Sequence, residues 1–276
     1  MPDPTLKPND KGPAVALAQD LLNRAGAILD ADGDFGGGTK RAVHEFRLAN
    51  GLPAADVIDD DLWQRLRALP EPSPDLPTRA VAFIAREEVG GRDYYDATAI
   101  HPEWPGGASG VTIGVGYDLG YQAGFAADWG DLLTVADLAA LKPWLGKTGD
   151  AAAAGPAQLT SITIPWHAAW SGYIRRTLPQ EIVKTRQTFI APAGNPLPPL
   201  CLGMLVSLVY NRGTAMTDNS DNDRRKEMRI IRDAVNVGDY AVVPAALLAM
   251  QRLWPSSSGL YGRRAREAKL FTEGLA

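Results

Sequence analysis

The chain has 276 residues, of which 45% are hydrophobic and 22% are charged, and its formal net charge is −4. This composition is typical of a globular protein, and the length is sufficient for two domains. The acidic balance disfavours a nucleic-acid-binding protein, because counterion release from a phosphate backbone requires a basic surface. No apolar run approaches the roughly 18 residues that span a bilayer, so we expect neither nucleic acid nor a membrane as a partner.

The cysteine and histidine content predicts no metal and no cofactor. The single cysteine, Cys201, excludes an internal disulfide, and its apolar surroundings (PLCLGMLVSLVYN) indicate a small buried side chain rather than a nucleophile. The three histidines are far apart in the sequence. The segment DADGDFGGGTKR begins like a calcium-binding loop, but it has Phe35 and Arg41 where such a loop requires Gly and Glu. We therefore expect a turn between helices there.

Three helices are predicted in the first 67 residues, in the segments GPAVALAQDLLNRAG, GGTKRAVHEFRLANG and IDDDLWQRLRAL. Gly26 is expected to end the first helix. Thr39 is the expected N-cap of the second, and the pair Asn50–Gly51 is expected to end it. The inward-facing residues of the third are expected to be Leu62, Trp63 and Leu66.

This three-helix module resembles the peptidoglycan-binding domain of many cell-wall hydrolases. The resemblance covers about residues 8–67 and implies binding to the bacterial cell wall; a purely structural spacer is the alternative. The matched residues are Gly12, Val15, Gln19, Leu22, Gly26, the turn DGDFG, Thr39, Ala42, Val43, Phe46, the segment NGL and Trp63.

A boundary is predicted after this module. The segment LRALPEPSPDLPTRA contains four prolines between Pro70 and Pro77, which do not sustain a helix and favour a semi-rigid spacer. We therefore predict a first domain over 1–67, a linker over 68–77 and a second domain over 78–276.

The stretch SGVTIGVGYDLG in the second domain alternates apolar with small or polar residues, as in a half-buried strand. Thr112 and Asp118 would be about 20 Å apart if these residues formed one straight strand. Gly114 and Gly116 tolerate positive φ and are able to turn the chain between them. If Thr112 and Asp118 act together, the sequence therefore predicts a bend or a hairpin at these glycines, with a bare glycine surface.

Glu88 is a candidate general acid. It continues the apolar stripe of Val81 and Ile84 along the predicted amphipathic helix in DLPTRAVAFIAREEVGG, whereas Glu87 points elsewhere and is expected to be solvated. Burial of a carboxyl group raises its pKa, as a general acid near neutral pH requires. A charge that simply ends the helix is the alternative.

These segments together resemble the phage-type lysozymes (muramidases), most of all the relatives that include the muramidase domain of the bacteriocin pesticin. The resemblance rests on WPGGASGVTIGVGYDLGY, LVSLVYNRGT and GLYGRRAREAKLF, in that order, and spans nearly all of residues 78–276. It implies a glycoside hydrolase. Its fold is expected to be mainly α (α+β), with a small β-hairpin at a sugar-binding cleft.

The resemblance also implies roles for individual residues. Glu88 takes the place of the general acid, which protonates the glycosidic oxygen. Asp118 takes the place of the catalytic carboxylate. Thr112 takes the place of the residue that orients a water. In the common phage lysozymes the aspartate precedes the threonine, and Asp96 occupies that position here. Because Asp118 follows Thr112 by six residues, as in the pesticin-like proteins, we favour Asp118 over Asp96.

Two further residues are candidates for substrate binding. Tyr117 lies within the glycine-containing motif, although a place in the hydrophobic core is the alternative. Asn211 follows an apolar helix in YNRG and is a candidate for contact with the acetamido group, with a helix C-cap as the alternative.

The sequence thus predicts a monomeric modular endolysin that binds peptidoglycan and cleaves the β-1,4 bond between N-acetylmuramic acid and N-acetylglucosamine. A lytic transglycosylase on the same fold and a non-catalytic wall-binding protein are the alternatives, and an inverting or a retaining outcome remains open. The N-terminal residues MPDPTLKPNDKG show no secretory signal. We therefore expect synthesis in a host cytoplasm and release to the peptidoglycan through a holin.

Overall fold

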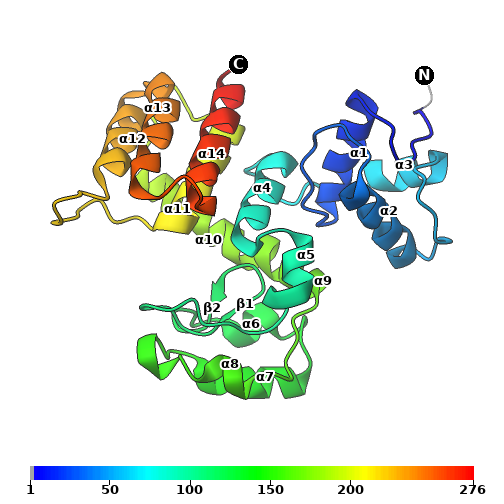
Figure 1. Cartoon of the computed structure of the whole chain (residues 1–276), viewed down its shortest axis with the longest axis horizontal. Coiled ribbons are helices and arrows are strands. Elements are labelled where there is room, and N and C mark those ends of the chain that lie inside the picture. Colours follow the sequence, from blue (N-terminus) through cyan, green and yellow to red (C-terminus); the bar gives the residue numbers. More distant parts are fainter. Residues whose placement is uncertain (1–2) are drawn as a thin grey trace. The chain divides into compact units, whose positions relative to one another are not determined.

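The computed structural model describes residues 3–276, which are mainly helical with one two-stranded antiparallel sheet (Figure 1). The predicted fold class is therefore confirmed. The chain forms two compact units. The first contains residues 1–72 and 85–177, and the second contains residues 73–84 and 178–276.

The N-terminal module of the first unit is a three-helix bundle, as predicted. Its helices are α1 (Pro13–Arg24), α2 (Gly37–Ala49) and α3 (Asp60–Arg67). Leu62, Trp63 and Leu66 are each at most 2% exposed and face a core of aliphatic residues with Phe35 and Phe46. Gly26 follows α1 with φ +88°, and Asn50 caps the C-terminal end of α2. Both predicted helix ends are confirmed.

The turn before α2 is organised by a buried glutamine. The two N–H groups of the Gln19 amide are shared among three acceptors, Asp32 Oδ1, the Asp34 carbonyl and Thr39 Oγ1, each 3.0 Å from the nitrogen. Its amide oxygen accepts from the Gly33 N–H at 2.9 Å. The predicted N-cap at Thr39 is wrong: α2 begins after Gly36, and Thr39 lies in the first turn with its hydroxyl committed to Gln19.

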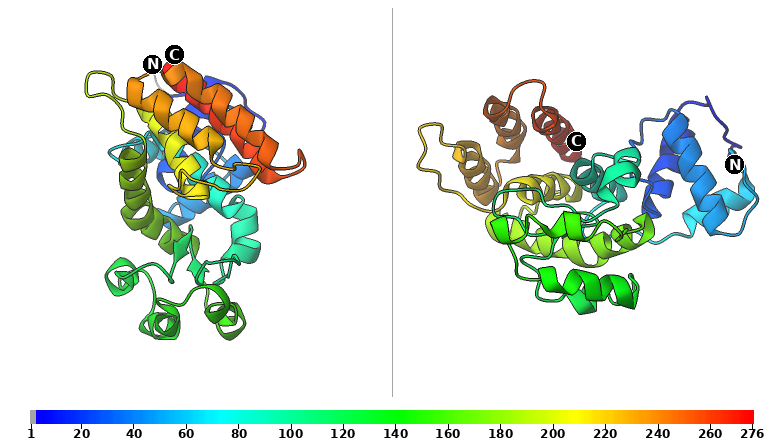
Figure 2. Two further views of the ribbon diagram at one scale, coloured as in Figure 1. Left: turned by 90° about the vertical axis from the view of Figure 1, so that its left-hand side faces the viewer. Right: turned by 60° about the horizontal axis from the view of Figure 1, so that its bottom comes forward.

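The remainder of the first unit surrounds the sheet with short helices, drawn from teal to light green in Figure 2. The strands are β1 (Thr112–Ile113) and β2 (Tyr117–Asp118). The α-helices are α5 (Arg92–Tyr94), α6 (Phe125–Trp129), α7 (Val135–Leu141), α8 (Gly155–Gln158) and α9 (Trp166–Gly172). Shorter helical turns are η1 (Tyr95–Ala99), η2 (Lys142–Trp144), η3 (Gly149–Ala151) and η4 (Tyr173–Thr177).

The second unit is a helical bundle in which α11 packs against α14, and α13 packs against both α12 and α14. Its elements are α10 (Leu178–Thr188), α11 (Pro199–Arg212), α12 (Lys226–Val237), η5 (Tyr240–Val242), α13 (Val243–Ala249), η6 (Met250–Leu253) and α14 (Gly259–Leu275). Buried Glu267 accepts hydrogen bonds from Ser207 at 2.6 Å and from Arg264 at 2.9 Å. These bonds compensate its charge inside the core.

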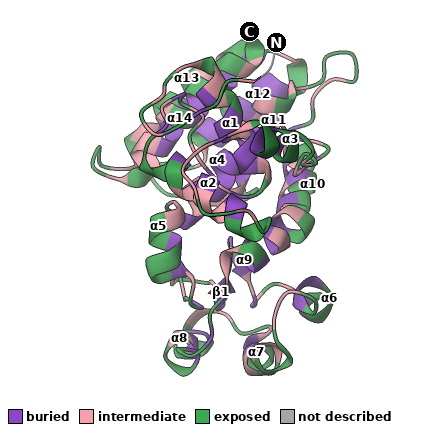
Figure 3. Cartoon of the chain, turned by 90° about the vertical axis from the view of Figure 1, so that its right-hand side faces the viewer, coloured by how far each residue is buried: buried purple, intermediate pink, exposed green. Residues whose placement is uncertain are grey.

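Helix α4 (Thr78–Val89) is buried around its whole circumference in its middle part, drawn purple in Figure 3. Residues 80–85 are each at most 3% exposed. The predicted amphipathic pattern is therefore wrong for this part of the helix. Its small side chains permit close packing: a Cβ on Gly203 of α11 would lie 2.5 Å from Ala80 Cβ.

A hydrogen bond and an ion pair attach the proline-rich segment to the rest of the chain. Before it, Arg24 donates to the Leu69 carbonyl at 3.0 Å. Within it, Ser73 is buried and its hydroxyl accepts from the Asp75 N–H at 3.1 Å, while Asp75 also pairs with Arg186 at 2.8 Å. The compact units also divide the chain differently from the predicted domains, because the module shares its unit with residues 85–177. The domain boundary at 68–77 stays a prediction.

Candidate active site

The glycine-rich motif forms a tight hairpin. Gly114 has φ +59° and Gly116 has φ +68°, and together with Val115 they connect the two strands. The antiparallel register pairs Thr112 directly with Asp118. The predicted turn at the glycines is therefore confirmed, and it brings together two residues that a straight strand would separate.

The hydrogen bonds show that Thr112 and Asp118 form a close pair. The backbone N–H and C=O of Thr112 are both used by Glu103, at 2.7 and 3.0 Å, while Leu119 donates to the Val111 carbonyl at 2.9 Å. Thr112 and Asp118 are thus a non-hydrogen-bonded pair, for which the Cα atoms are about 4.5 Å apart. Directly paired residues project to the same face of a sheet, so both side chains share one face.

The Asp118 carboxylate is held by backbone N–H groups. Oδ1 accepts from Gly120 at 2.8 Å, and both oxygens accept from Gly110 at 3.0 Å. A Cβ on Gly110 would lie 2.4 Å from Asp118 Oδ1, so only glycine allows this approach. Because a carboxylate has about four acceptor sites, part of Oδ2 remains available to a ligand or a water.

Thr112 is 8% exposed, and its hydroxyl lies 3.5 Å from the Gly110 carbonyl oxygen. That distance is long for a hydrogen bond between a hydroxyl and a carbonyl. The hydroxyl is consequently able to bind a small ligand on the face that it shares with Asp118.

Glu88 lies in the last turn of α4 and is partly buried, and Glu87 is partly buried as well. Gly90 and Gly91, with φ of +70° and +92°, follow the helix and end it. Glu88, Thr112 and Asp118 all belong to the first compact unit.

Asp96, the alternative carboxylate, lies outside the hairpin. It is exposed on the η1 turn, where its Oδ2 accepts from Arg92 at 3.1 Å. The side chain is thus part of an ion pair on a helical surface.

Tyr117 lies in the core, which was the alternative for this residue. It is 1% exposed, its hydroxyl donates to Asp128 Oδ2 at 2.7 Å, and its ring packs against Trp129 with centroids 5.4 Å apart. Burial raises the pKa of the phenol. The structure leaves no surface of Tyr117 for stacking on a sugar, so the candidate contact is not available in this conformation.

Asn211 belongs to the second unit, in the last turn of α11. The helix is capped by Gly213, with φ +67°, so the alternative C-cap role at Asn211 is wrong. Its amide oxygen accepts from Arg264 at 3.4 Å, and it lines a pocket of about 430 Å³ with Arg212 and Trp254. Burial and the neighbouring arginines lower the pKa of Arg212 to about 10. Asn211 thus lies on the wall of a cationic pocket.

Glu103 was missed by the sequence analysis. Its backbone pairs with Thr112, so Glu103, Thr112 and Asp118 form one row across the sheet. Its side chain reaches the surface, yet desolvation raises the pKa of its carboxyl group. Prolines flank EW in HPEWPGG, and the restriction of proline to edge strands is the signal that would have suggested an edge strand.

Within residues 3–276, no cluster of three or more His, Cys, Asp or Glu side chains is arranged to hold a metal ion. In the same range no helix is long and apolar enough to cross a bilayer.

Comparison with known families assigns the N-terminal module. Residues 11–66 match the family described as "Putative peptidoglycan binding domain". The three-helix module is therefore similar to the peptidoglycan-binding domains, the family that its ordered matches predicted. No curated protein matches the chain.

Among solved structures, the chain is similar to the crystal structure of an endolysin from the Burkholderia phage AP3. The identity is 17%, the match covers 98% of this chain and 100% of that chain, and the TM-score is 0.23. A TM-score this low does not define a shared arrangement of elements.

Proposed function

We propose that this protein is an endolysin of the muramidase type, which binds peptidoglycan and hydrolyses the β-1,4 bond between N-acetylmuramic acid and N-acetylglucosamine. The observation that carries the proposal is the pairing of Thr112 with Asp118 across the hairpin, with the Asp118 carboxylate fixed by two glycine amides. The family of the N-terminal module supports peptidoglycan as the substrate polymer.

In the proposed mechanism Glu88 protonates the glycosidic oxygen as the bond breaks. Thr112 and Asp118 hold a water between their side chains, and Asp118 accepts a proton from it as it attacks the anomeric carbon. Rigid orientation is valuable here, because displacement of a catalytic group by about 1 Å can reduce a rate by about 100-fold. The hydrogen bonds to Gly110 and Gly120 supply that orientation.

This mechanism implies inversion at the anomeric centre. The water requires the two carboxyl groups to be about 6.5–9.5 Å apart, whereas a nucleophilic Asp118 would require about 5 Å. A lytic transglycosylase needs the acid but no water-activating carboxylate. The fixed Asp118 therefore favours hydrolysis over transglycosylation, and it also disfavours a non-catalytic wall-binding protein.

The proposal places the action of the protein at the cell wall, as a monomer that reaches peptidoglycan after release through a holin. Asn211 remains the proposed contact for an acetamido group. The N-terminal module would raise the local concentration of the catalytic residues at an insoluble substrate.

A panel of variants tests the proposal by the loss of turbidity of purified peptidoglycan. Glu88→Gln, Asp118→Asn and Thr112→Ala are expected to lose most activity, whereas Asp96→Asn and Glu87→Gln retain it. Mass spectrometry of the products separates hydrolysis, which leaves reducing muramic acid ends, from transglycosylation, which leaves 1,6-anhydro ends. Equal losses at Asp96 and Asp118 would contradict the assignment of the carboxylate.

A further inference from the structure

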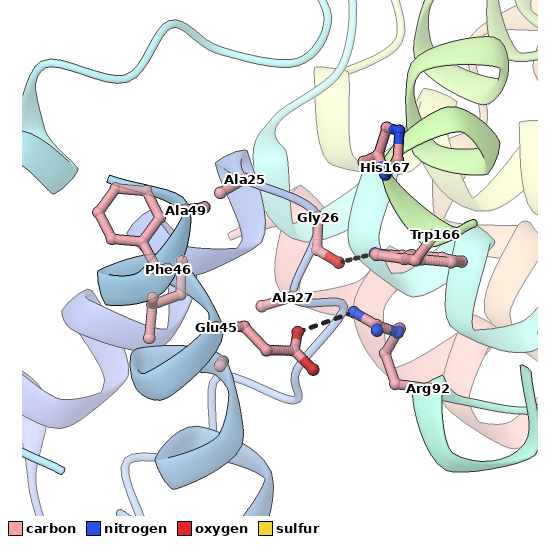
Figure 4. Close-up of a pocket in the computed structure, with 11 residues that line it drawn as sticks. Ala25, Gly26, Ala27, Glu45, Phe46, Ala49, Arg92, Trp166 and His167 are labelled. Atoms are coloured by element: carbon pink, nitrogen blue, oxygen red, sulfur yellow. Dashed lines mark hydrogen bonds and ion pairs between the residues drawn. The ribbon is translucent and has the colours of Figure 1, made fainter. Parts of the chain in front are cut away.

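The first unit contains a pocket of about 270 Å³ between the N-terminal module and the segments that follow α4 (Figure 4). On the module side, small apolar side chains such as Ala27 and Ala49 line it together with Phe46. On the other side lie Arg92 of α5 and Trp166 of α9. The pocket thus combines residues of the peptidoglycan-binding domain with residues from outside it.

Direct hydrogen bonds hold the two sides together. Trp166 Nε1 donates to the Gly26 carbonyl at 2.7 Å, and Arg92 Nη1 pairs with Glu45 Oε2 at 3.1 Å. A Cβ on Gly26 would lie 2.8 Å from the Trp170 ring, so this approach requires glycine. The pocket is therefore a built feature of the unit, with walls fixed by both segments.

Arg92 presents a donor that the protein does not satisfy. Its side chain is 9% exposed, its guanidinium lies over the Trp166 ring at 4.8 Å, and its Nη atoms pair with Glu45 and Asp96. Its Nε atom is buried and has no hydrogen-bond partner in the protein. A buried unsatisfied donor costs about 1–3 kcal/mol. Because this atom is closed to solvent, an acceptor oxygen from a ligand in the pocket would remove that cost once the guanidinium shifts toward the pocket.

The remaining pocket walls add an acceptor and a small apolar surface to the Arg92 donor. The Glu45 side chain is 43% exposed; its Oε2 pairs with Arg92 and its Oε1 lies 3.7 Å from Arg41 Nε. A carboxylate has about four acceptor sites, so acceptor capacity remains. The methyl groups of Ala27 and Ala49 offer a small apolar surface. A donor, an acceptor and a methyl-sized apolar wall complement a secondary amide that carries a methyl group, through its C=O, its N–H and its CH₃ respectively.

We infer that this pocket binds such an amide of peptidoglycan, with the amide C=O accepting from Arg92 and the amide N–H donating to Glu45. Peptidoglycan supplies this group in two places: the acetamido substituent of its sugars and the alanyl units of its stem peptides. The inference rests on peptidoglycan as the proposed polymer, and it adds that Arg92 and Trp166, outside residues 11–66, take part in wall binding.

Two probes that contain no glycosidic bond between sugars distinguish the two sources. Isotope-labelled full-length protein is titrated with N-acetylglucosamine or with L-alanyl-D-isoglutamine, and the backbone amide shifts of Gly26 and Ala27 are followed by NMR. Saturable shifts with the sugar or with the dipeptide support the inference and identify the source. Glucosamine, which lacks the acetyl group, is the matched control for the sugar and is expected to bind at least about tenfold more weakly.

Variants then locate the site. Ala49→Phe fills the pocket and is expected to weaken binding of the active probe at least about tenfold, whereas Leu48→Phe, at a neighbouring residue that is 56% exposed, leaves it unchanged. Glu45→Gln retains an amide oxygen but loses the charge, and it is expected to weaken binding by less than Ala49→Phe. No shift with either probe, or equal affinities of the Ala49→Phe and wild-type proteins, would overturn the inference.

Pelleting with intact peptidoglycan separates this inference from the proposed function. Wild-type protein that pellets while neither probe binds at the pocket refutes the pocket alone. Wild-type protein that does not pellet refutes peptidoglycan binding itself, and with it the premise on which the inference rests.

Discussion

Substitution of Gly114 by alanine tests how the hairpin positions the candidate active site. Two costs are expected. Gly114 has φ +59°, and a left-handed conformation costs a residue with a Cβ about 1–2 kcal/mol. The new Cβ would also lie 2.9 Å from Trp129 Cη2, and this ring is 1% exposed and packed against Tyr117. Overpacking of such a site costs about 1–3 kcal/mol more.

Gly107→Ala is the matched control. Gly107 has nearly the same φ, +58°, but a Cβ added there would meet nothing within 4 Å. The backbone cost and the effect on the unfolded chain are therefore shared by the two variants. The difference between their free energies of unfolding isolates the contact with Trp129, and we expect Gly114→Ala to be the less stable by about 1–3 kcal/mol.

Urea denaturation followed by tryptophan fluorescence measures the difference in free energy of unfolding between the two variants. The loss of turbidity of peptidoglycan measures their activity. A shift of the strands would displace Thr112 relative to Asp118, so Gly114→Ala is also expected to lose activity by about tenfold or more at sub-denaturing temperature. If Gly114→Ala proved as stable as Gly107→Ala, the steric reasoning would be wrong. Full activity in a destabilised Gly114→Ala would instead show that hairpin geometry does not limit catalysis.

Three further results are expected. Burial raises the pKa of the Cys201 thiol to about 12, so a thiol reagent at pH 8 should react only after denaturation; rapid labelling of native protein would contradict this. Folding raises the pKa of Glu103, so the ionised carboxylate destabilises the folded protein. This cost is absent below the pKa of the unfolded state and appears as pH rises through the pKa of the folded state. Glu103→Gln should therefore become more stable relative to wild type over that window, and a pH-independent difference in Tm would refute the effect. Gln19→Leu should destabilise the module by about 2 kcal/mol, because it leaves buried partners such as the Gly33 N–H unsatisfied; unchanged pelleting with peptidoglycan at elevated temperature would argue against this.

The helices of the N-terminal module were predictable because their signals are local. The apolar spacing around Trp63 and the stop at Gly26 act within a few residues, and the structure confirms both. The N-cap of the second helix was not predictable in the same way, because the Thr39 hydroxyl has a second possible partner that is distant in sequence. Gln19 binds that hydroxyl, and the helix begins at Gly37 instead.

In the candidate site, too, some features were predictable from local sequence and others were not. Two glycines between Thr112 and Asp118 predicted a turn, since only a turn allows the two side chains to meet. Glu103 could not be placed beside them, because its partnership with Thr112 depends on an isolated bridge that leaves no periodic pattern. The apolar alternation around Tyr117 was equally compatible with a sugar-stacking ring and a buried one, and the hydrogen bond to Asp128 selects burial.

The sequence by itself determined the helical class, the three-helix module and the turn between Thr112 and Asp118, because spacing and glycine act over short stretches of chain. Only the tertiary structure decided that Arg92 and Trp166 meet the module at a shared pocket. Such contacts join residues more than 40 positions apart, as Glu45 and Arg92 are. They depend on how whole elements pack, and no local pattern encodes that.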